Sequence, residues 1–463
     1  MPSAVHTYTI DLPGDIDLLA VHRALPKRWP FLLSSTAAGG ALGRFNFLLF
    51  QDGESFGIPA PGPDHRIRAC DQPFKQSAEH FFRYLQDLPL ENFSRKISPS
   101  TSSTWPFVGG WFIYLAYELV ASIETRLDLP SADDALPIAW LARCPAALIV
   151  DNLTGTTTLL AETPEILDQA KSCLDLADYS VIQAAGIPAL DLVADPGKVF
   201  KDGVDQIREW IRAGDVFQVN LSRAWHGRSE QSIDPAAVYL ALAQANPSPF
   251  AGLARLPGGT VISSSPERLV EVRDGIAQTR PIAGTRPRGH DHHSDAAMSA
   301  ELVGHPKERA EHIMLIDLER NDLGRVCETG SVQVDELMAI ESYAHVHHIV
   351  SNIRGQLRPG VGAAEVIKAV FPGGTITGCP KVRCMEIIAA LEGQGRSFYT
   401  GSMGYIGRDG HMDLNILIRS LRVSDNEIEF RTGAGIVADS DPEAELAETE
   451  AKATGLLRAL LPQ

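Results

Sequence analysis

Residues 258–285 read GGTVISSSPERLVEVRDGIAQTRPIAGT and contain the clearest strand pattern of the chain. Strand-forming residues gather in GGTVISSSPERLVEV (258–272) and again in IAQTRPIAGT (276–285), with charged and glycine turn residues between the two runs. Short runs of this kind, bounded by turn residues, predict strands that pair with their neighbours in sequence. The stretch therefore predicts hairpin-like strands of an antiparallel sheet.

Helical patterns surround these strands on both sides. The segment VFQVNLSRAW (216–225) predicts one further strand, and apolar residues at helical spacing predict helices before and after it. The expected helices are Pro73–Leu88, Ile166–Ala177, Val204–Ala213, Pro235–Ala245, Pro306–Leu323 and Pro442–Leu461. The sequence thus favours a protein of mixed α and β structure.

One segment of mixed periodicity separates two parts of the chain. IQAAGIPALDLVADPG (182–197) contains two prolines and no sustained helical or strand pattern, which is typical of a connection. We expect an N-terminal region at residues 1–185 and a second region at residues 198–463. The sharper patterns of the second region indicate that the chemistry lies there.

Composition excludes several classes of protein. The chain has 463 residues, 58 acidic against 41 basic side chains, and a formal net charge of −17, which argues against a general nucleic-acid binder. The start MPSAVHTYTI lacks the features of a signal peptide, and the apolar stretch 137–150 is interrupted by Arg143. We expect a cytoplasmic protein without nucleic-acid or membrane partners, whose six scattered cysteines are reduced.

Two helical segments each carry two glutamates three residues apart. Glu445, Glu448 and Lys452 share one face of the last helix, because residues at i, i+3 and i+7 lie on one side. Glu308 and Glu311 repeat the spacing in the helix that begins near residue 306. Carboxylates of two helices could hold one Mg2+ ion, which prefers oxygen ligands. A solvated, ion-paired helix face is the alternative interpretation.

Two glycine-rich segments resemble nucleotide-binding motifs but depart from them. In FPGGTITGCPK (371–381), Cys379 stands where a phosphate-binding loop needs lysine. The run Gly433, Ala434, Gly435 leaves too little chain for a dinucleotide-binding domain. We interpret both as loops whose N–H groups approach a carboxylate, with ordinary tight turns as the alternative.

Glu267 and the histidines of HVHHIVS are further candidates. Glu267 follows a proline at the end of an apolar strand, where burial would raise its pKa into the range of a general acid, although a surface glutamate is the simpler interpretation. Strand alternation would place His345 and His347 on one face and His348 on the other. A shared zinc ion is therefore not expected.

From Asp215 to Lys452 the chain resembles the chorismate-utilising enzymes, block after block and in order. Weaker likeness extends into the N-terminal region through LLSS (32–35), GRFNF (43–47) and the segment 106–118. The matching blocks are GDVFQVNLS (214–222), SSSPERL (263–269), TRPIAGT (279–285), KERAEHIMLIDLERNDLGRV (307–326), HHIVSNIRGQL (347–357), FPGGTITGCPKVRCMEII (371–388), YTGSMGYIG (399–407), DLNILIRSL (413–421), TGAGIVADS (432–440) and AELAETEAK (444–452).

The resemblance implies a fold and a metal. The fold would be one large α/β domain of two facing antiparallel sheets flanked by helices, with Mg2+ and chorismate between them. Glu311 and Glu448 resemble the direct Mg2+ ligands of the family, and Glu308 and Glu445 resemble ligands that act through water.

The resemblance also assigns roles around the substrate. Glu267 resembles the general acid that protonates the departing C4 hydroxyl, while His348 and Thr285 resemble residues that line the pocket. The residues that resemble binders of the two substrate carboxylates are Tyr399, Arg419, Gly433, Ala434, Gly435 and Lys452.

Two positions bear on which reaction the chain performs. Family members that add water at C2 resemble one another in having a lysine where this chain has Gln218, and a glutamine cannot deprotonate water. Ammonia needs no such base. Ala283, in PIAGT, is typical of anthranilate synthases, whereas many aminodeoxychorismate synthases have a lysine there.

Other sequence blocks favour the aminodeoxychorismate synthase activity. The length, VHHIVS (346–351), TITG (375–378), NPSPFAGL (246–253) and LLSS (32–35) are more similar to aminodeoxychorismate synthase component I. We therefore expect amination of chorismate at C4 towards p-aminobenzoate and folate, with anthranilate synthase component I as the alternative. Because no glutaminase-type cysteine and His-Glu pair is evident, we expect ammonia from a separate glutamine amidotransferase subunit.

Overall fold

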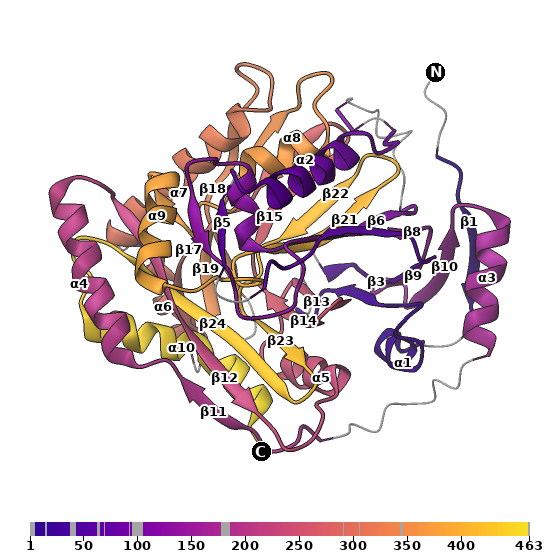
Figure 1. Ribbon diagram of the computed structural model, residues 1–463, viewed down its shortest axis with the longest axis horizontal. Helices are drawn as coiled ribbons and strands as arrows, with labels where there is room; N and C mark the ends of the chain where they lie inside the picture. The colour runs from indigo at the N-terminus through magenta and orange to yellow at the C-terminus, as the bar shows by residue number, and fades with distance from the viewer. Residues whose placement is uncertain are drawn as a thin grey trace.

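Two large antiparallel sheets face each other and carry helices on their outer faces (Figure 1). The computed structural model describes residues 5–13, 16–37, 43–62, 65–68, 70–91, 93–94, 105–176, 186–289, 291–304, 306–342 and 346–461. This architecture confirms the fold class expected from the sequence.

The first sheet has 12 strands and contains both the first and the last strand of the described chain. Its order is β1-β10-β9-β3-β2-β13-β14-β23-β24-β12-β11, and β20 pairs with β12 beside this path. The bounds are β1 Tyr8–Leu12, β2 Phe31–Ser34, β3 Phe45–Phe50, β9 Ala146–Asp151, β10 Thr156–Ala161, β11 Asp191–Ala194, β12 Gln218–Arg228, β13 Phe250–Leu256, β14 Gly259–Ser265, β20 Gly378–Cys379, β23 Ser420–Ser424 and β24 Glu427–Ile436.

The second sheet has 10 strands, in the order β17-β19-β16-β15-β22-β21-β6-β8-β4 with β18 beside β19. A separate pair, β5 (Arg66–Arg68) and β7 (Asp128–Pro130), lies outside both sheets. The bounds are β4 Ser55–Ile58, β6 Gly110–Leu115, β8 Ala139–Cys144, β15 Arg268–Arg273, β16 Ile276–Thr279, β17 Ile282–Pro287, β18 Gln333–Ser342, β19 Val346–Gln356, β21 Ser402–Gly407 and β22 Met412–Asn415.

Helices cover the sheets from outside. In Figure 1, α2 and α8 lie over the second sheet. On the first sheet, α10 packs against β24 and α5 against β14. The bounds are α1 Leu18–Ala24, α2 Gln72–Gln86, α3 Pro164–Asp175, α4 Gly197–Ala213, α5 Pro235–Ala245, α6 His292–Gly304, α7 Pro306–Gly324, α8 Ala363–Val370, α9 Lys381–Glu392, α10 Pro442–Leu460 and the 3-10 helix η2 Tyr117–Ser122.

Strand alternation in β3 divides the core into layers. Phe47 and Leu49 point into the cluster between the sheets, while Leu48 and Phe50 pack under the outer helices. Between the sheets, the rings of Phe31 and Phe112 stack with their centroids 3.8 Å apart. Burying both faces of a sheet removes a large apolar area from water, which is the main favourable contribution to folding.

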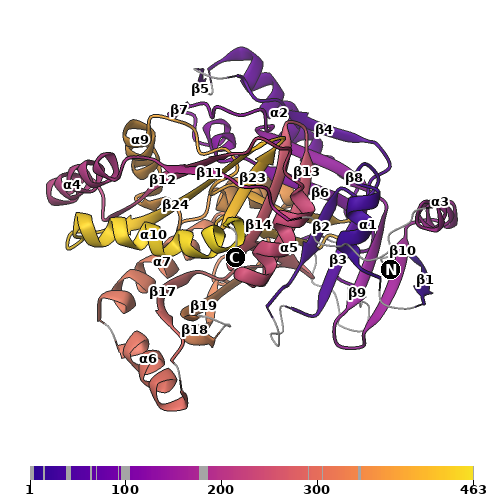
Figure 2. The ribbon, with the colours of Figure 1, turned by 90° about the horizontal axis from the view of Figure 1, so that it is seen from below.

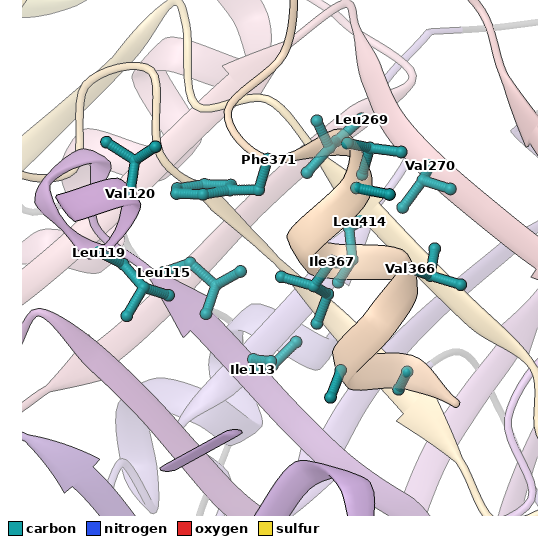
Figure 3. Close-up of a cluster of buried hydrophobic side chains, with 14 of the residues drawn as sticks. Ile113, Leu115, Leu119, Val120, Leu269, Val270, Val366, Ile367, Phe371 and Leu414 are labelled. Atoms are coloured by element: carbon teal, nitrogen blue, oxygen red, sulfur yellow. The ribbon is translucent and has the colours of Figure 1, made fainter. Parts of the chain in front are cut away.

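A second layer lies between the 10-stranded sheet and its helices. Figure 3 shows α8 lying across this sheet, with Val366, Ile367 and the neighbouring Phe371 near Leu269 and Leu414. All five side chains are buried. This apolar layer fixes α8 and holds the start of the glycine-rich segment after residue 370 against the sheet.

Most expected helices agree with the structure within about two residues, but α4 begins at Gly197, seven residues before the expected start at Val204, and one expected strand is divided in two. The expected helix Pro235–Ala245 has those bounds, because Asp234 caps its first turn and Pro235 suits the first helical position. The expected hairpin between the runs 258–272 and 276–285 is present as β15 paired with β16. The run 258–272, however, is two strands and not one: β14 pairs with β13 and β23 in the first sheet, whereas β15 pairs with β16 and β22 in the second. The chain changes sheets at Pro266.

Both sheets contain strands from either side of the expected boundary at residues 185–198. Residues 177–185 lie outside the described part of the chain, so the division into two regions stays a prediction. None of the described helices is long and apolar enough to cross a membrane. All six cysteines are free, as expected.

Candidate active site

The chain changes sheets twice at one place. It leaves the first sheet after β14 and enters the second at β15 through Glu267, and it returns from β22 to β23 through Arg419. The two crossings are hydrogen-bonded to each other, because the Ile416 N–H donates to the Glu267 carbonyl at 3.0 Å and the Ser264 N–H donates to the Arg419 carbonyl at 3.1 Å. Two charged side chains are thus fixed where the sheets separate.

A cavity of about 600 Å3 opens at these crossings. It lies between the sheets, α7 and α10; in Figure 2, α10 lies beside β24, across from α7, β17 and β19. The sequence-predicted residues that line it are Gln218, Glu267, Ala283, Glu308, Glu311, His348, Tyr399, Arg419, Gly433, Gly435, Glu445, Glu448 and Lys452. Residues from distant parts of the sequence therefore meet in one space.

Two of the predicted site residues, Ala434 and Thr285, are not among the described residues that line the cavity. The Ala434 side chain is fully buried against Val219 and Leu221, on the opposite face of β24, so only its backbone can serve the cavity. The backbone of Thr285 pairs with His348 in the β17–β19 ladder, but its side chain lies outside the described part of the structure.

Gly433 and Gly435 form part of the cavity wall because they lack side chains. A Cβ on Gly433 would lie 2.9 Å from both the Tyr399 hydroxyl and the Asn220 Oδ1, and a Cβ on Gly435 would collide with the Gln218 amide. Both contacts are too close for any substitution without movement of a neighbour. The glycines leave space rather than providing a nucleotide-type turn.

Glu267 is a buried carboxyl group at the base of the cavity. Only 5% of its surface is exposed, and burial raises its pKa from 4.5 to about 7. The hydroxyl of Thr375 and the positive charges of Arg419 and Lys452 oppose this rise in pKa. Among the described residues its Oε1 has no hydrogen-bond partner. Glu267 can therefore hold a proton near neutral pH and donate it inside the cavity.

His348, on β19 of the second sheet, is a neutral side chain that lines the cavity. Burial and the charge of Arg419 lower its pKa to about 4, and its Nδ1 lies 3.4 Å from the Gly284 carbonyl. His347, the next residue, points away and contacts Asp295 and Ser342. This opposite orientation confirms the expected alternation for these two residues; His345 lies outside the described part.

Positive charge gathers around the glycines despite the negative charge of the whole chain. Lys452 donates to the Gly433 carbonyl at 3.0 Å and pairs with Glu448 at 2.6 Å. Arg419 has a backbone φ of 51°, a left-handed conformation that is uncommon outside glycine and often marks functional sites. The Arg419 side chain is half-buried, and removal from water lowers its pKa against the opposing effect of Tyr399 and nearby carboxylates. An anion can bind here.

Four glutamates from α7 and α10 line the same cavity, as their spacing predicts. Glu308 lies 3.3 Å from Arg286, and Glu448 pairs with Lys452. Within the described ranges, no three His, Cys, Asp or Glu side chains are close enough together to hold a metal ion. The donor chemistry of the four carboxylates nevertheless fits a hard divalent cation such as Mg2+.

Sequence reasoning missed several polar residues of the cavity. Asn220 lies two positions after Gln218 on β12, and both side-chain oxygens are buried without a hydrogen-bond partner in the described part of the chain. Period-two alternation from Gln218 could have indicated Asn220. Arg431 is 2% exposed, bonds to Ser222 and Glu392, and also lines the cavity. No local motif marks it.

Comparison with known proteins identifies the family of this chain. Residues 46–458 match the family described as chorismate binding enzyme. The chain belongs to this family. The family match confirms the resemblance to chorismate-utilising enzymes that the ordered sequence blocks indicate.

Relatives of this chorismate-binding enzyme carry the names of two activities. An anthranilate synthase component I-like protein from Synechocystis sp. is 44% identical over 411 residues, covering 86% of this chain and 84% of the relative. Aminodeoxychorismate synthase component 1 from Bacillus subtilis is 49% identical over 390 residues, covering 80% and 82%. The crystal structure of anthranilate synthase component I from Streptococcus pneumoniae superposes with a TM-score of 0.76 at 28% identity, covering 90% and 93%.

Proposed function

We propose that this enzyme is an aminodeoxychorismate synthase component I, which replaces the C4 hydroxyl of chorismate with an amino group from ammonia and releases water. The observation that carries the amination is Gln218 in the cavity wall. An amide cannot act as a base towards water, and Lys452 is the sole lysine among the described lining residues. Ammonia is already a nucleophile and needs no base.

Amination at C4, which leads towards p-aminobenzoate and folate, is supported by two lines of reasoning. Sequence blocks such as VHHIVS and TITG favour it, and the 49% identical Bacillus subtilis relative carries this name. Ala283 lines the cavity, so a lysine at this position would reach the reacting ring. In its absence, ammonia itself serves as the nucleophile throughout.

The cavity residues supply the acid and the binding groups. Glu267, protonated up to about pH 7, donates its proton to the C4 hydroxyl as the C–O bond breaks. Arg419, Lys452 and the Tyr399 hydroxyl hold the two substrate carboxylates, with N–H groups of the strand around Gly433 completing the site. His348, neutral at this pH, lines the pocket without adding charge.

Mg2+ is the cofactor we assign to the four glutamates. Enzymes of this family generally use Mg2+. Glu311 and Glu448 would hold the ion directly, with Glu308 and Glu445 supporting it through water. When bound, the ion neutralises and polarises the ring carboxylate of chorismate.

We also propose that ammonia is delivered in a heterodimer, by a separate glutamine amidotransferase subunit. The naming of the relatives as component 1 supports a second component. A cytoplasmic location suits this metabolism.

Product analysis tests the proposal. Purified protein is incubated with chorismate, Mg2+ and an ammonium salt, and products are separated by chromatography with and without added aminodeoxychorismate lyase. We expect p-aminobenzoate that depends on the lyase. Anthranilate and pyruvate formed without the lyase would refute amination at C4.

Anthranilate synthase component I is the second candidate. Ala283 favours it, because a lysine-free PIAGT segment is typical of those enzymes, and several relatives carry that name. In that case ammonia attacks C2, and pyruvate and water leave.

A further inference from the structure

A buried group of three charged side chains lies behind the cavity wall, where α9 lies beside β12 (Figures 1 and 2). We call it the charge cluster. It consists of Glu392 at the end of α9, Arg396, and Arg431 of β24, whose side chains are 1%, 1% and 2% exposed. Glu392 Oε1 lies 2.7 Å from Arg396 Nη2, and its Oε2 lies 3.1 Å from Arg431 Nη2. One carboxylate thus faces two guanidinium groups, and the cluster holds one excess positive charge.

Arg431 carries the charge that is not matched. Arg396 donates two hydrogen bonds to Glu392, at 3.0 and 2.7 Å. Arg431 is held more loosely: its Nε and Nη2 contact the Ser222 hydroxyl at 3.2 and 3.1 Å, and its Nη1 is buried without a hydrogen-bond partner in the described part of the chain. A buried cation with an unmade hydrogen bond lowers stability, and departures of this kind are expected at functional sites. Asp195 also interacts with Arg431, but it is only half-buried, where water weakens the interaction.

The glycine at position 433 leaves space next to Arg431 on the cavity side. Arg431 and Gly433 lie on the same face of β24, because side chains alternate along a strand, and both line the cavity. A Cβ on Gly433 would lie 2.9 Å from the Tyr399 hydroxyl. The space beside Gly433 is therefore bordered by Tyr399 and is adjacent to Arg431 along the strand. This is the place where we position a substrate carboxylate.

The charge cluster also acts on Tyr399. The Arg396 guanidinium lies over the Tyr399 ring, with its Cζ 5.5 Å from the ring centroid. Burial raises the pKa of Tyr399. The positive charges of Arg396, Arg431 and Arg419 oppose this rise in pKa, whereas the negative charge of Glu392 supports it. A phenol in a positive potential is a stronger hydrogen-bond donor. The cluster therefore favours an anion that accepts a hydrogen bond from the Tyr399 hydroxyl.

Other basic side chains of the cavity already face carboxylates of the protein. Lys452 pairs with Glu448 at 2.6 Å, and Arg286 lies 3.3 Å from Glu308. Glu392, by contrast, balances only one of the two arginines beside it. The excess charge of the cluster is therefore available to a bound anion, and it lies in a buried place where charges interact more strongly than in water.

We propose that Arg431 is a positioning residue for substrate binding: the excess positive charge that it brings to the charge cluster attracts the substrate carboxylate held beside Gly433 by the Tyr399 hydroxyl. Arg431 acts from behind the wall without touching the substrate, because its guanidinium is buried and bound to Ser222 and Glu392. This inference rests on the proposed function, in which Tyr399 binds a carboxylate of chorismate.

Two substitutions of opposite charge test this inference. Arg431→Gln lowers the net charge of the cluster from +1 to 0, Glu392→Gln raises it to +2, and the double variant returns it to +1. The dissociation constant of chorismate is measured by titration calorimetry with Mg2+ and without ammonia, and kcat and KM are measured with ammonium. We expect Arg431→Gln to weaken chorismate binding by about tenfold, as for one charge removed from a buried site, with kcat within about twofold of the wild type. The double variant should recover most of the affinity, and Glu392→Gln should bind no more weakly than the wild type.

Stability measurements separate this role from a structural one. Arg431→Gln leaves Glu392 paired with Arg396 and removes a buried N–H without a partner, so its midpoint of thermal unfolding should not fall. Arg223→Gln is the matched control, because Arg223 is a buried arginine of the neighbouring strand β12 that is not among the described residues lining the cavity. It should bind chorismate like the wild type. If Glu392→Gln does not fold, the double variant compared with Arg431→Gln gives the same test of sign.

Three results would overturn the inference. Unchanged chorismate affinity in Arg431→Gln would refute it, and so would a double variant that binds as weakly as Arg431→Gln. An Arg431→Gln variant that does not fold would assign the cluster to stability alone. By contrast, wild-type protein that binds chorismate but forms no aminated product would refute the proposed function, whereas the dissociation constants would still decide the role of Arg431.

Discussion

Replacement of Glu267 by glutamine should lower the catalytic activity of this protein while raising its stability at high pH. The carboxyl group is 5% exposed, and burial raises its pKa from 4.5 to about 7. Glutamine has almost the same shape but neither a charge nor an acidic proton. The variant should therefore be catalytically poor and, at high pH, more stable than the wild type.

The size of the stability effect follows from proton linkage. Between pH 4.5 and about pH 7 the folded carboxyl keeps its proton while the unfolded chain has released it, so the folded state binds more protons. The free energy of unfolding must then fall as pH rises, by about 1.4 kcal/mol per pH unit. Between about pH 5.5 and pH 8.5, ionisation of Glu267 should therefore lower the free energy of unfolding of the wild type by about 2 kcal/mol. This contribution should be absent from Glu267→Gln.

Urea unfolding at the two pH values measures this difference, and Glu118→Gln is the matched control. Glu118 is also buried with a pKa raised to about 7, but it accepts N–H groups of Arg396 and Ser397 and lies outside the cavity. Both variants should gain stability at high pH, whereas only Glu267→Gln should lose turnover, by about 100-fold to 10,000-fold. Equal pH dependence in wild type and Glu267→Gln, or unchanged turnover, would refute the reasoning.

Three further predictions concern the cavity wall, the carboxylate binders and the metal. Gly435→Ala puts a methyl group against the Gln218 amide, the flexible end of a side chain that can move aside, so we expect little lost stability but a lower kcat/KM, measured by thermal unfolding and steady-state kinetics; a fully active variant would contradict the packing. Lys452→Met should raise the KM for chorismate by about tenfold or more, as loss of a charged hydrogen bond predicts, and an unchanged KM would remove Lys452 from substrate binding. Treatment with EDTA should abolish turnover, and added Mg2+ should restore it. Both Glu311→Gln and Glu448→Gln should need a higher Mg2+ concentration for half-maximal rate, because each loses an oxygen ligand. An unchanged Mg2+ requirement would show that these two glutamates do not bind the ion.

Some secondary-structure elements could be predicted from local sequence patterns alone. The helix Pro235–Ala245 has its predicted bounds because its cap, its proline and its apolar residues all lie within the segment. The hairpin between the runs 258–272 and 276–285 was predicted, but the division of the first run into β14 and β15, which pair in different sheets, was not. Pairing partners are set by long-range contacts, which local periodicity does not contain.

For the candidate site, helical spacing gave the glutamates of α7 and α10, and the resemblance to a family gave most of the remaining lining residues. Asn220 was within reach of strand alternation from Gln218. Arg431 was not, because its place in the cavity depends on the pairing of β24 with β12 and on its bonds to Ser222 and Glu392.

Local sequence was enough to predict six of the helices, several strands and the family, since caps, periodicity and ordered blocks are properties of neighbouring residues. Only the tertiary structure decided that Glu267 and Arg419 lie at adjacent sheet crossings. It also decided the pKa values of Glu267 and His348. The physical reason is that burial and proximity, which set pKa values and create cavities, arise only when distant segments pack together.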